Sequence, residues 1–131
     1  MPAINWWAIV VAALVAFVAS SVWYIVLGKE LATVSPAFAE GLQKRQPWKM
    51  LFVIAQHLLI ALVLAYFIGR LGKVDWLGAV LIGVLLWIGL SAMQWVGSMV
   101  WEKVPWKLAA IHAGDWLVKL IIISALVGVW R

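Results

Sequence analysis

The hydrophobic and polar positions divide the chain into four long apolar stretches joined by short polar segments. The stretches cover about residues 5–27, 48–69, 76–101 and 106–130. Even the shortest, at about 1.5 Å of rise per residue, spans the roughly 30 Å hydrocarbon core of a bilayer. None alternates with a period of two, and each is more than twice as long as a barrel strand. The pattern predicts one all-α domain over residues 1–131, an integral membrane four-helix bundle.

The polar segment between the first two stretches has a pattern of its own at residues 35–45, SPAFAEGLQKR. Ser35 suits a helix N-cap and Pro36 suits the first helical position. Phe38 and Leu42 would lie on one side of such a helix, and basic residues follow it. The segment is expected to be a short interfacial helix or a re-entrant turn, and a plain solvated loop is the alternative.

Two short motifs recur at the starts of the stretches. QPWKM at 46–50 returns as VPWKL at 104–108, and the Asn-Trp pair that begins at Asn5 is echoed by the Asp-Trp pair at Asp75. Asn and Asp cap helix N-termini, Pro suits a first turn, and Trp and Lys suit the membrane interface. The chain is therefore expected to form two helical hairpins, related either by duplication or by convergence on residues that favour helix starts.

Composition supports the membrane assignment and narrows the function. The 131 residues are 67% hydrophobic and 11% charged, with a mean hydropathy of +1.09, whereas soluble domains are about half apolar and a quarter charged. The first apolar stretch has no Lys/Arg-rich leader and is expected to be a retained span. There is no cysteine, which excludes disulfides and thiol chemistry. The net charge of +5 arises from residues that flank the spans, so no nucleic acid partner is expected.

The distribution of Lys and Arg predicts the orientation. Loops one and three carry six of them, against three in the termini and loop two. The positive-inside rule then places both termini outside and loops one and three in the cytoplasm. The chain is thus expected to be a multi-pass protein of the cell membrane, which in a bacterium is the inner membrane. The six are Lys29, Lys44, Arg45, Lys49, Lys103 and Lys107, and the three are Arg70, Lys73 and Arg131.

Three ionisable residues lie within the fourth stretch: His112, Asp115 and Lys119. At 100° per residue, Asp115 and Lys119 fall about 60° and about 20° from His112, so all three share one arc of the helix. A lone charge at the bilayer centre costs from about 2.5 to more than 10 kcal/mol. The arc should therefore face the bundle interior, with Asp115 and Lys119 neutralising each other.

His57 in the second stretch is expected to join this cluster. Aligning the two Pro-Trp-Lys motifs places His57 at the depth of Asp115, so we expect the two side chains to approach each other near the bundle axis, with His112 about one helical turn away. Gln56, Ser91 and Gln94 are the candidate polar neighbours. The last two belong to a stripe on the third stretch that favours a packing seam over a substrate path.

Small residues recur at every fourth position of three stretches and predict close helix packing, within the chain or with another subunit. A chain this small would not enclose a wide pore alone, so a homo-oligomer or partner membrane subunits are expected beside the lipid bilayer. The ladders are Ala8, Ala12, Ala16 and Ser20; Ala61, Ala65 and Gly69; and Ala110 with Gly114 and Ser124 with Gly128.

Several roles remain open for the cluster of His57, His112, Asp115 and Lys119. It could relay protons or ions, bind a small molecule or lipid head group with Lys119 as counter-charge, or ligate a haem or pigment through His57 or His112. It could also be a structural network that pins helix packing or meets a partner of which this chain is an accessory subunit. No catalytic motif is present, so no enzyme and no metal site is expected.

The first and last stretches carry a family resemblance. NWWAIVVAALVAFVASSVWY followed by LGK, and the closing PWKLAAIHAGDWLVKLIIISALVGVW, are similar to the small bacterial four-helix membrane proteins grouped as domain of unknown function 1761. The middle of the chain carries the resemblance poorly. It implies a four-span fold and no established activity, and it assigns no functional residue.

Overall fold

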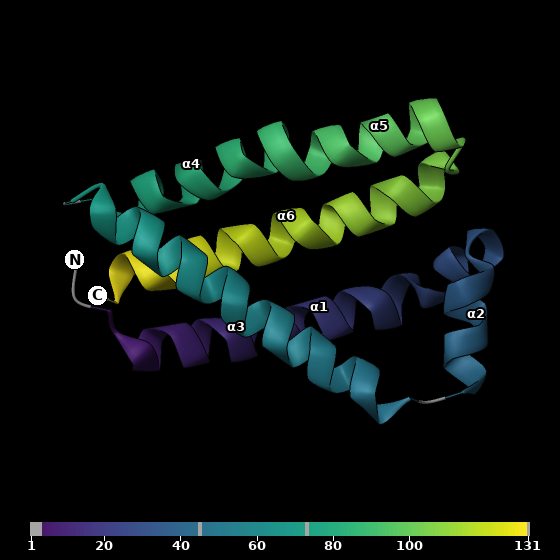
Figure 1. Cartoon of the computed structure of the whole chain (residues 1–131), viewed down its shortest axis with the longest axis horizontal. Helices are drawn as coiled ribbons and strands as arrows, with labels where there is room; N and C mark the ends of the chain where they lie inside the picture. Colours follow the sequence, from purple (N-terminus) through teal and green to yellow (C-terminus); the bar gives the residue numbers. More distant parts are fainter. Residues whose placement is uncertain (1–3, 45, 73, 131) are drawn as a thin grey trace.

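A computed structural model describes residues 4–44, 46–72 and 74–130 of the chain, and these form helices with no strand (Figure 1). Four helical spans are long and apolar enough to cross a membrane, as expected, and the structure fits a multi-pass membrane protein. They are α1 (Trp6–Val34), α3 (Pro47–Arg70), the composite span Trp76–Glu102 and α6 (Trp106–Val129).

The third span is not one regular α-helix. It consists of α4 (Trp76–Leu86), a π-helical turn η1 (Trp87–Ala92) and α5 (Met93–Glu102). A π-helical turn contains more residues than an α-helical turn and is rare outside short insertions of this kind. The residues after η1 therefore face different directions from those that uniform α-helical spacing predicts.

The first helix is longer than the apolar pattern predicts. The apolar stretch ends near Leu27, but α1 continues through Glu30 to Val34. At 1.5 Å per residue its 29 residues measure about 43 Å, about 13 Å more than the hydrocarbon core. Charge ends the hydrophobic run without ending the helix, because Lys and Glu are good helix formers.

The short helix predicted in loop one is present as α2 (Pro36–Gln43). Ser35 ends α1 and caps α2, since its Oγ accepts a hydrogen bond of 3.1 Å from the Phe38 amide. The Phe38 ring lies 6.2 Å from the ring of Tyr24, measured between centroids. This contact folds α2 against α1.

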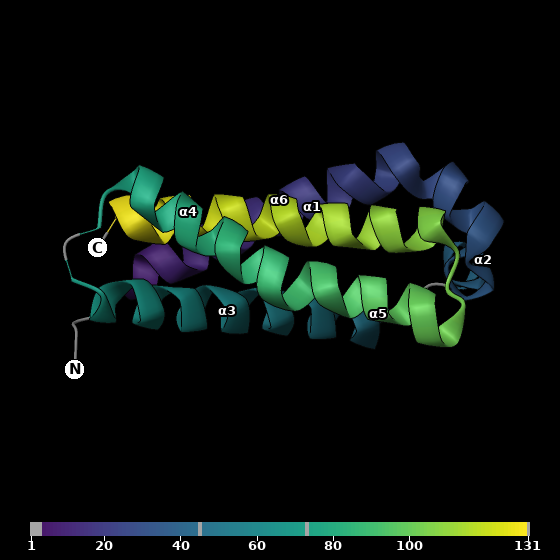
Figure 2. The same ribbon diagram turned by 90° about the horizontal axis from the view of Figure 1, so that it is seen from above.

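Both described chain ends lie at one end of the molecule, as an even number of spans requires (Figures 1 and 2). We call this the terminal end, and the opposite end, with α2 and the connection between α5 and α6, the α2 end. The expected caps are present, since Asn5 accepts from the Ala8 amide at 3.2 Å and Asp75 from the Gly78 amide at 2.8 Å. Which end faces the cytoplasm stays a prediction.

Helix α6 is the centre of the structure. It contacts α1, α3 and α4 extensively and α5 and η1 as well, whereas α4 and α5 have at most a marginal contact with α1 or α3. The chain does form two antiparallel hairpins, but they pack asymmetrically (Figure 1). A twofold-related pair would place α4 or α5 against α3 as closely as α1 packs on α6.

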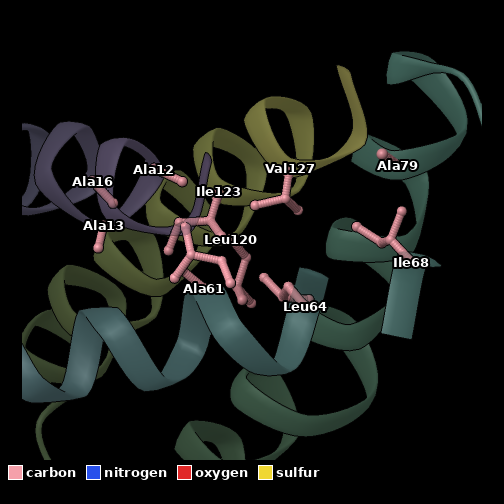
Figure 3. Packing of buried hydrophobic residues seen from close by; sticks show 11 residues of the cluster. Ala12, Ala13, Ala16, Ala61, Leu64, Ile68, Ala79, Leu120, Ile123 and Val127 are labelled. Carbon is pink, nitrogen blue, oxygen red and sulfur yellow. The ribbon is translucent and has the colours of Figure 1, made fainter. Parts of the chain in front are cut away.

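The apolar core occupies the terminal end and is built on small residues (Figure 3). Ala12 and Ala16 of α1, Ala61 of α3 and Ile123 of α6 are completely buried. Methyl-sized side chains let the helix backbones approach closely, which is how helices associate when lipid removes the hydrophobic driving force. The predicted ladder on α1 is therefore confirmed as a packing face.

Candidate intramembrane binding site

Asp115 and Lys119 form a buried ion pair within α6. Lys119 Nζ lies 2.9 Å from Asp115 Oδ2, and the residues are 4% and 2% exposed, respectively. Ser20 of α1 donates a hydrogen bond of 2.5 Å to Asp115 Oδ1. The ammonium also lies 4.7 Å from the centroid of the Trp116 ring, a cation–π geometry. The predicted pairing is present, and the pair carries no net charge.

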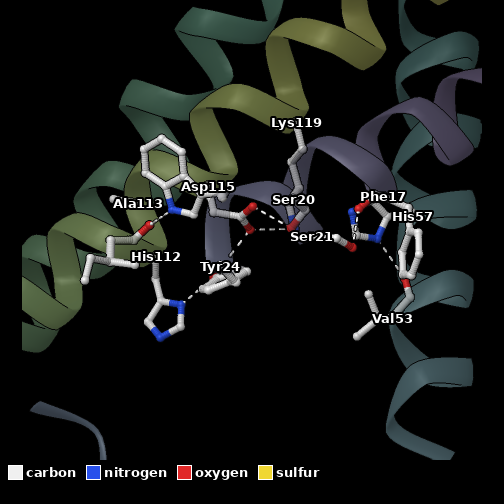
Figure 4. Close-up of polar contacts among 12 residues, drawn as sticks. Phe17, Ser20, Ser21, Tyr24, Val53, His57, His112, Ala113, Asp115 and Lys119 are labelled. Atoms are coloured by element: carbon white, nitrogen blue, oxygen red, sulfur yellow. Dashed lines mark hydrogen bonds and ion pairs between the residues drawn. The ribbon is translucent and has the colours of Figure 1, made fainter. Parts of the chain in front are cut away.

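Tyr24 of α1 connects this pair to His112. Its hydroxyl oxygen lies 2.7 Å from His112 Nδ1 and 3.5 Å from Asp115 Oδ2 (Figure 4). The His112 ring stacks on Trp95 of α5, with centroids 5.1 Å apart and planes 15° from parallel. His112 is thus on the arc expected from its spacing, but it is held by Tyr24 and Trp95 rather than by Asp115.

Two indoles fix the polar half of α6 from either side. Trp23 Nε1 of α1 donates to the Ile111 carbonyl at 2.9 Å, and Trp87 Nε1 of η1 donates to the Ala113 carbonyl at 2.8 Å. The Trp23 ring fits over Gly114, where an added Cβ would lie 2.5 Å from Cζ2. Gly114 is therefore required for this approach.

His57 of α3 is 1% exposed and faces the bundle rather than lipid. Its Nδ1 lies 2.8 Å from the Val53 carbonyl oxygen, and its ring meets Phe17 edge-on. A carbonyl oxygen can only accept, so Nδ1 carries a hydrogen, and in the neutral imidazole Nε2 is then an acceptor. Within the described part of the chain, Nε2 has no hydrogen-bond partner.

A cavity of about 410 Å³ brings these groups together between α1, α3, α6 and α2. His57, Asp115 and Lys119 contribute to its wall, together with Ser20 and Tyr24, and Figure 4 shows that no hydrogen bond or ion pair joins His57 to Asp115. The remaining wall is mostly apolar. It consists of Phe17, Ser21, Phe38, Met50, Val53, Gln56 and Trp116.

The sequence model of one family, described as protein of unknown function (DUF1761), matches residues 7–128. The chain belongs to this family. Searches among curated proteins and among solved structures find no match.

The structure separates the other candidate site residues of this DUF1761 protein. Gln56 lines the cavity with His57, as expected, but Ser91 and Gln94 do not. They line a second, largely apolar cavity of about 390 Å³, beyond Trp116. The third span contacts α6 but has at most a marginal contact with α1, which forms the wall of the first cavity together with α2, α3 and α6, so its side chains do not reach that cavity.

The two histidines of the DUF1761 protein do not share the cavity, since His112 is not among its lining residues. A haem or pigment ligated through His57 or His112 would therefore take one of these imidazoles as its ligand and not both. Within the described residues, no three His, Asp or Glu side chains are grouped as a metal site would require.

Sequence inspection missed two members of the site, Ser20 and Tyr24. Ser20 was identified only as a packing residue at the end of the alanine ladder, and Tyr24 was not among the candidate site residues. A signal did exist, because a hydroxyl that continues a buried small-residue ladder must face a neighbouring helix, where it can meet a polar group. Which group it meets depends on how α1 and α6 are aligned, and that is visible only in the fold.

Proposed function

We propose that this DUF1761 protein binds a small amphipathic molecule, such as a lipid, in the cavity beside Asp115 and Lys119. The observation that carries the proposal is the unpartnered Nε2 of His57, which is buried at the wall of that cavity. A buried acceptor without a partner costs free energy, commonly about 1–3 kcal/mol. A ligand that donates a hydrogen bond there would recover that free energy.

The cavity also has the two-sided character that an amphipathic ligand needs. Polar groups cluster around the Asp115–Lys119 pair and His57, while Phe17, Phe38 and Met50 supply apolar walls. Met50 is 54% exposed, so the apolar side reaches the outer surface of the helices. A lipid-soluble molecule could therefore enter sideways from the bilayer, head group first. The volume is within the usual range of ligand pockets, about 300–1,000 Å³.

The role we propose is binding or transfer of the ligand rather than a covalent reaction. A second candidate, a packing network in an accessory subunit, is supported by the complete pairing of Asp115 with Lys119 and Ser20. The two candidates differ at His57, because a network that serves packing alone has no use for an unpartnered acceptor at a cavity wall.

Two valines of α3 provide a matched test. Val53 lines the cavity with His57, and Val63 lines the second cavity. We expect Val53→Phe to abolish saturable binding of a spin-labelled or radiolabelled lipid amphiphile to the purified protein in maltoside micelles, and Val63→Phe to leave it intact. Equal binding by both variants and the parent, or no saturable binding by the parent, would contradict the proposal and favour the packing role.

A further inference from the structure

We infer that the ligand of this cavity is a long-chain carboxylic acid whose carboxyl group lies between His57 and Lys119, an inference that rests on the proposed function. The two residues come from different helices, α3 and α6, and line one cavity from different sides. Together they specify what the head group of the ligand must offer.

His57 requires a hydrogen-bond donor. Its Nδ1 is committed to the Val53 carbonyl, so in the neutral imidazole Nε2 is an acceptor, and His57 lines the cavity. Within the described residues, this buried acceptor has no hydrogen-bond partner. An ester or a ketone, which carries acceptors only, cannot satisfy it.

Lys119 requires an acceptor. Its ammonium has three N–H donors, of which one is directed to Asp115 Oδ2, and one side of it faces the Trp116 ring. Donor capacity remains toward the cavity. An amine, which as an ammonium carries donors only, cannot use it and would add an uncompensated positive charge.

The charge balance of the cavity favours a ligand that enters it uncharged. The charged and titratable groups around the cavity are Tyr24 from α1, His57 from α3, and Asp115 with Lys119 from α6. Helix α2 contributes the apolar Phe38 and no such group to the wall. Asp115 and Lys119 cancel, so the site has no spare positive charge to extract a free anion from water. A protonated carboxylic acid meets this condition, and such acids partition into the bilayer.

A carboxyl group also offers each of the two partners an atom of its own. Its O–H can donate to His57 Nε2 while its carbonyl oxygen accepts from Lys119, whereas an alcohol must meet both with one oxygen. If the proton moves, the O–H bond breaks and the Nε2–H bond forms. The resulting carboxylate then faces an imidazolium and an ammonium, and the net charge of the site is unchanged. The alkyl tail follows Phe17 and Met50 toward the bilayer.

A competition experiment on the full chain in a nonionic maltoside tests the head group. Radiolabelled palmitic acid is displaced by unlabelled palmitic acid, hexadecanol, methyl palmitate or hexadecylamine. We expect the acid to compete at least about tenfold better than each of the others, as loss of one buried hydrogen bond to a charged group would produce. Equal competition by the ester or the alcohol would overturn the carboxyl assignment and leave the amphiphile site standing. Displacement by none of the four, including the acid itself, would overturn both proposals.

Substitution of His57 tests the partner. With the protein folded by helicity and gel filtration, His57→Phe should reduce the preference for acid over methyl ester to near one, while His57→Gln, which keeps an acceptor, should retain part of it. Val63→Phe is the control and should keep the full preference. If the Phe variant does not fold, the Gln variant still decides, because an undiminished preference in it would overturn the role of Nε2.

Discussion

The two halves of α6 solve the problem of packing in a membrane in different ways. From Trp106 to Lys119 the helix is held by indole, hydroxyl and ionic contacts, and from Leu120 to Val129 it is held by close apolar packing. Figure 1 shows that α3 crosses α1 and that the two helices diverge from the crossing toward α2. The cavity lies where α3 diverges, and the alanine contacts lie where the helices meet.

This difference indicates that one half of α6 mainly stabilises the bundle and the other half mainly forms the candidate site. The terminal end is stabilised by close contact between small residues, and the buried Ser124 hydroxyl there has no hydrogen-bond partner within the described residues. The α2 end buries an ion pair and a histidine beside a cavity, an arrangement that stability alone does not require. The comparison leads to three predictions, in order of decreasing effect on the free energy of unfolding.

The largest effect is expected from separating the ion pair. Lys119→Leu leaves Asp115 buried without its counter-charge and should lower the free energy of unfolding by about 3 kcal/mol. The double change Asp115→Asn with Lys119→Leu should recover most of this loss while abolishing ligand binding. The measurement is an SDS titration in mixed micelles followed by tryptophan fluorescence. A double variant that binds ligand normally and is more stable than the parent would show that the pair has no functional role.

An intermediate effect is expected in the alanine-packed half. Ala16 is completely buried between helices, so Ala16→Leu should cost about 1–3 kcal/mol through overpacking in the same titration. Ala19, one turn away on a face with exposed aliphatic neighbours, is the control and should change little on the same substitution. Similar losses from both would mean that the helices do not meet along the alanine ladder.

The smallest effect is expected at the link between His112 and Asp115. Tyr24→Phe removes one hydroxyl that contacts both and should cost about 0.6 kcal/mol, the usual value of an interhelical polar contact in a membrane. A double-mutant cycle with Ser20→Ala measures whether Tyr24 and Ser20 act together on Asp115. Strict additivity in this cycle would show that the hydroxyls do not form one network.

Much of this architecture follows from the sequence because it depends on local physics. Spans, caps and the pairing of Asp115 with Lys119 are determined by hydrophobic length, terminal amides and a four-residue spacing, all of which are visible along the chain. The first span extends beyond its predicted end because a helix can continue after its apolar residues end. Glu30, in this extension, forms an ion pair with Lys107.

The site was harder to predict because its members come from several helices. The shared depth of His57 and Asp115 fits their place at one cavity, although no hydrogen bond or ion pair joins them. The sequence also could not show that α6, and not a symmetric pair of hairpins, would be the centre of packing. That outcome depends on how side chains of three helices fit against one another.

The π-helical turn at Trp87–Ala92 also bears on how this family can diverge. Such a turn corresponds to one extra residue in an otherwise regular helix. Removing one residue there would restore a continuous α-helix. Gly83, before the turn, and Trp95, after it, would both still face α6. A gap of one position in this span, between relatives that otherwise align without gaps, would then record the gain or loss of the bulge rather than a change of fold.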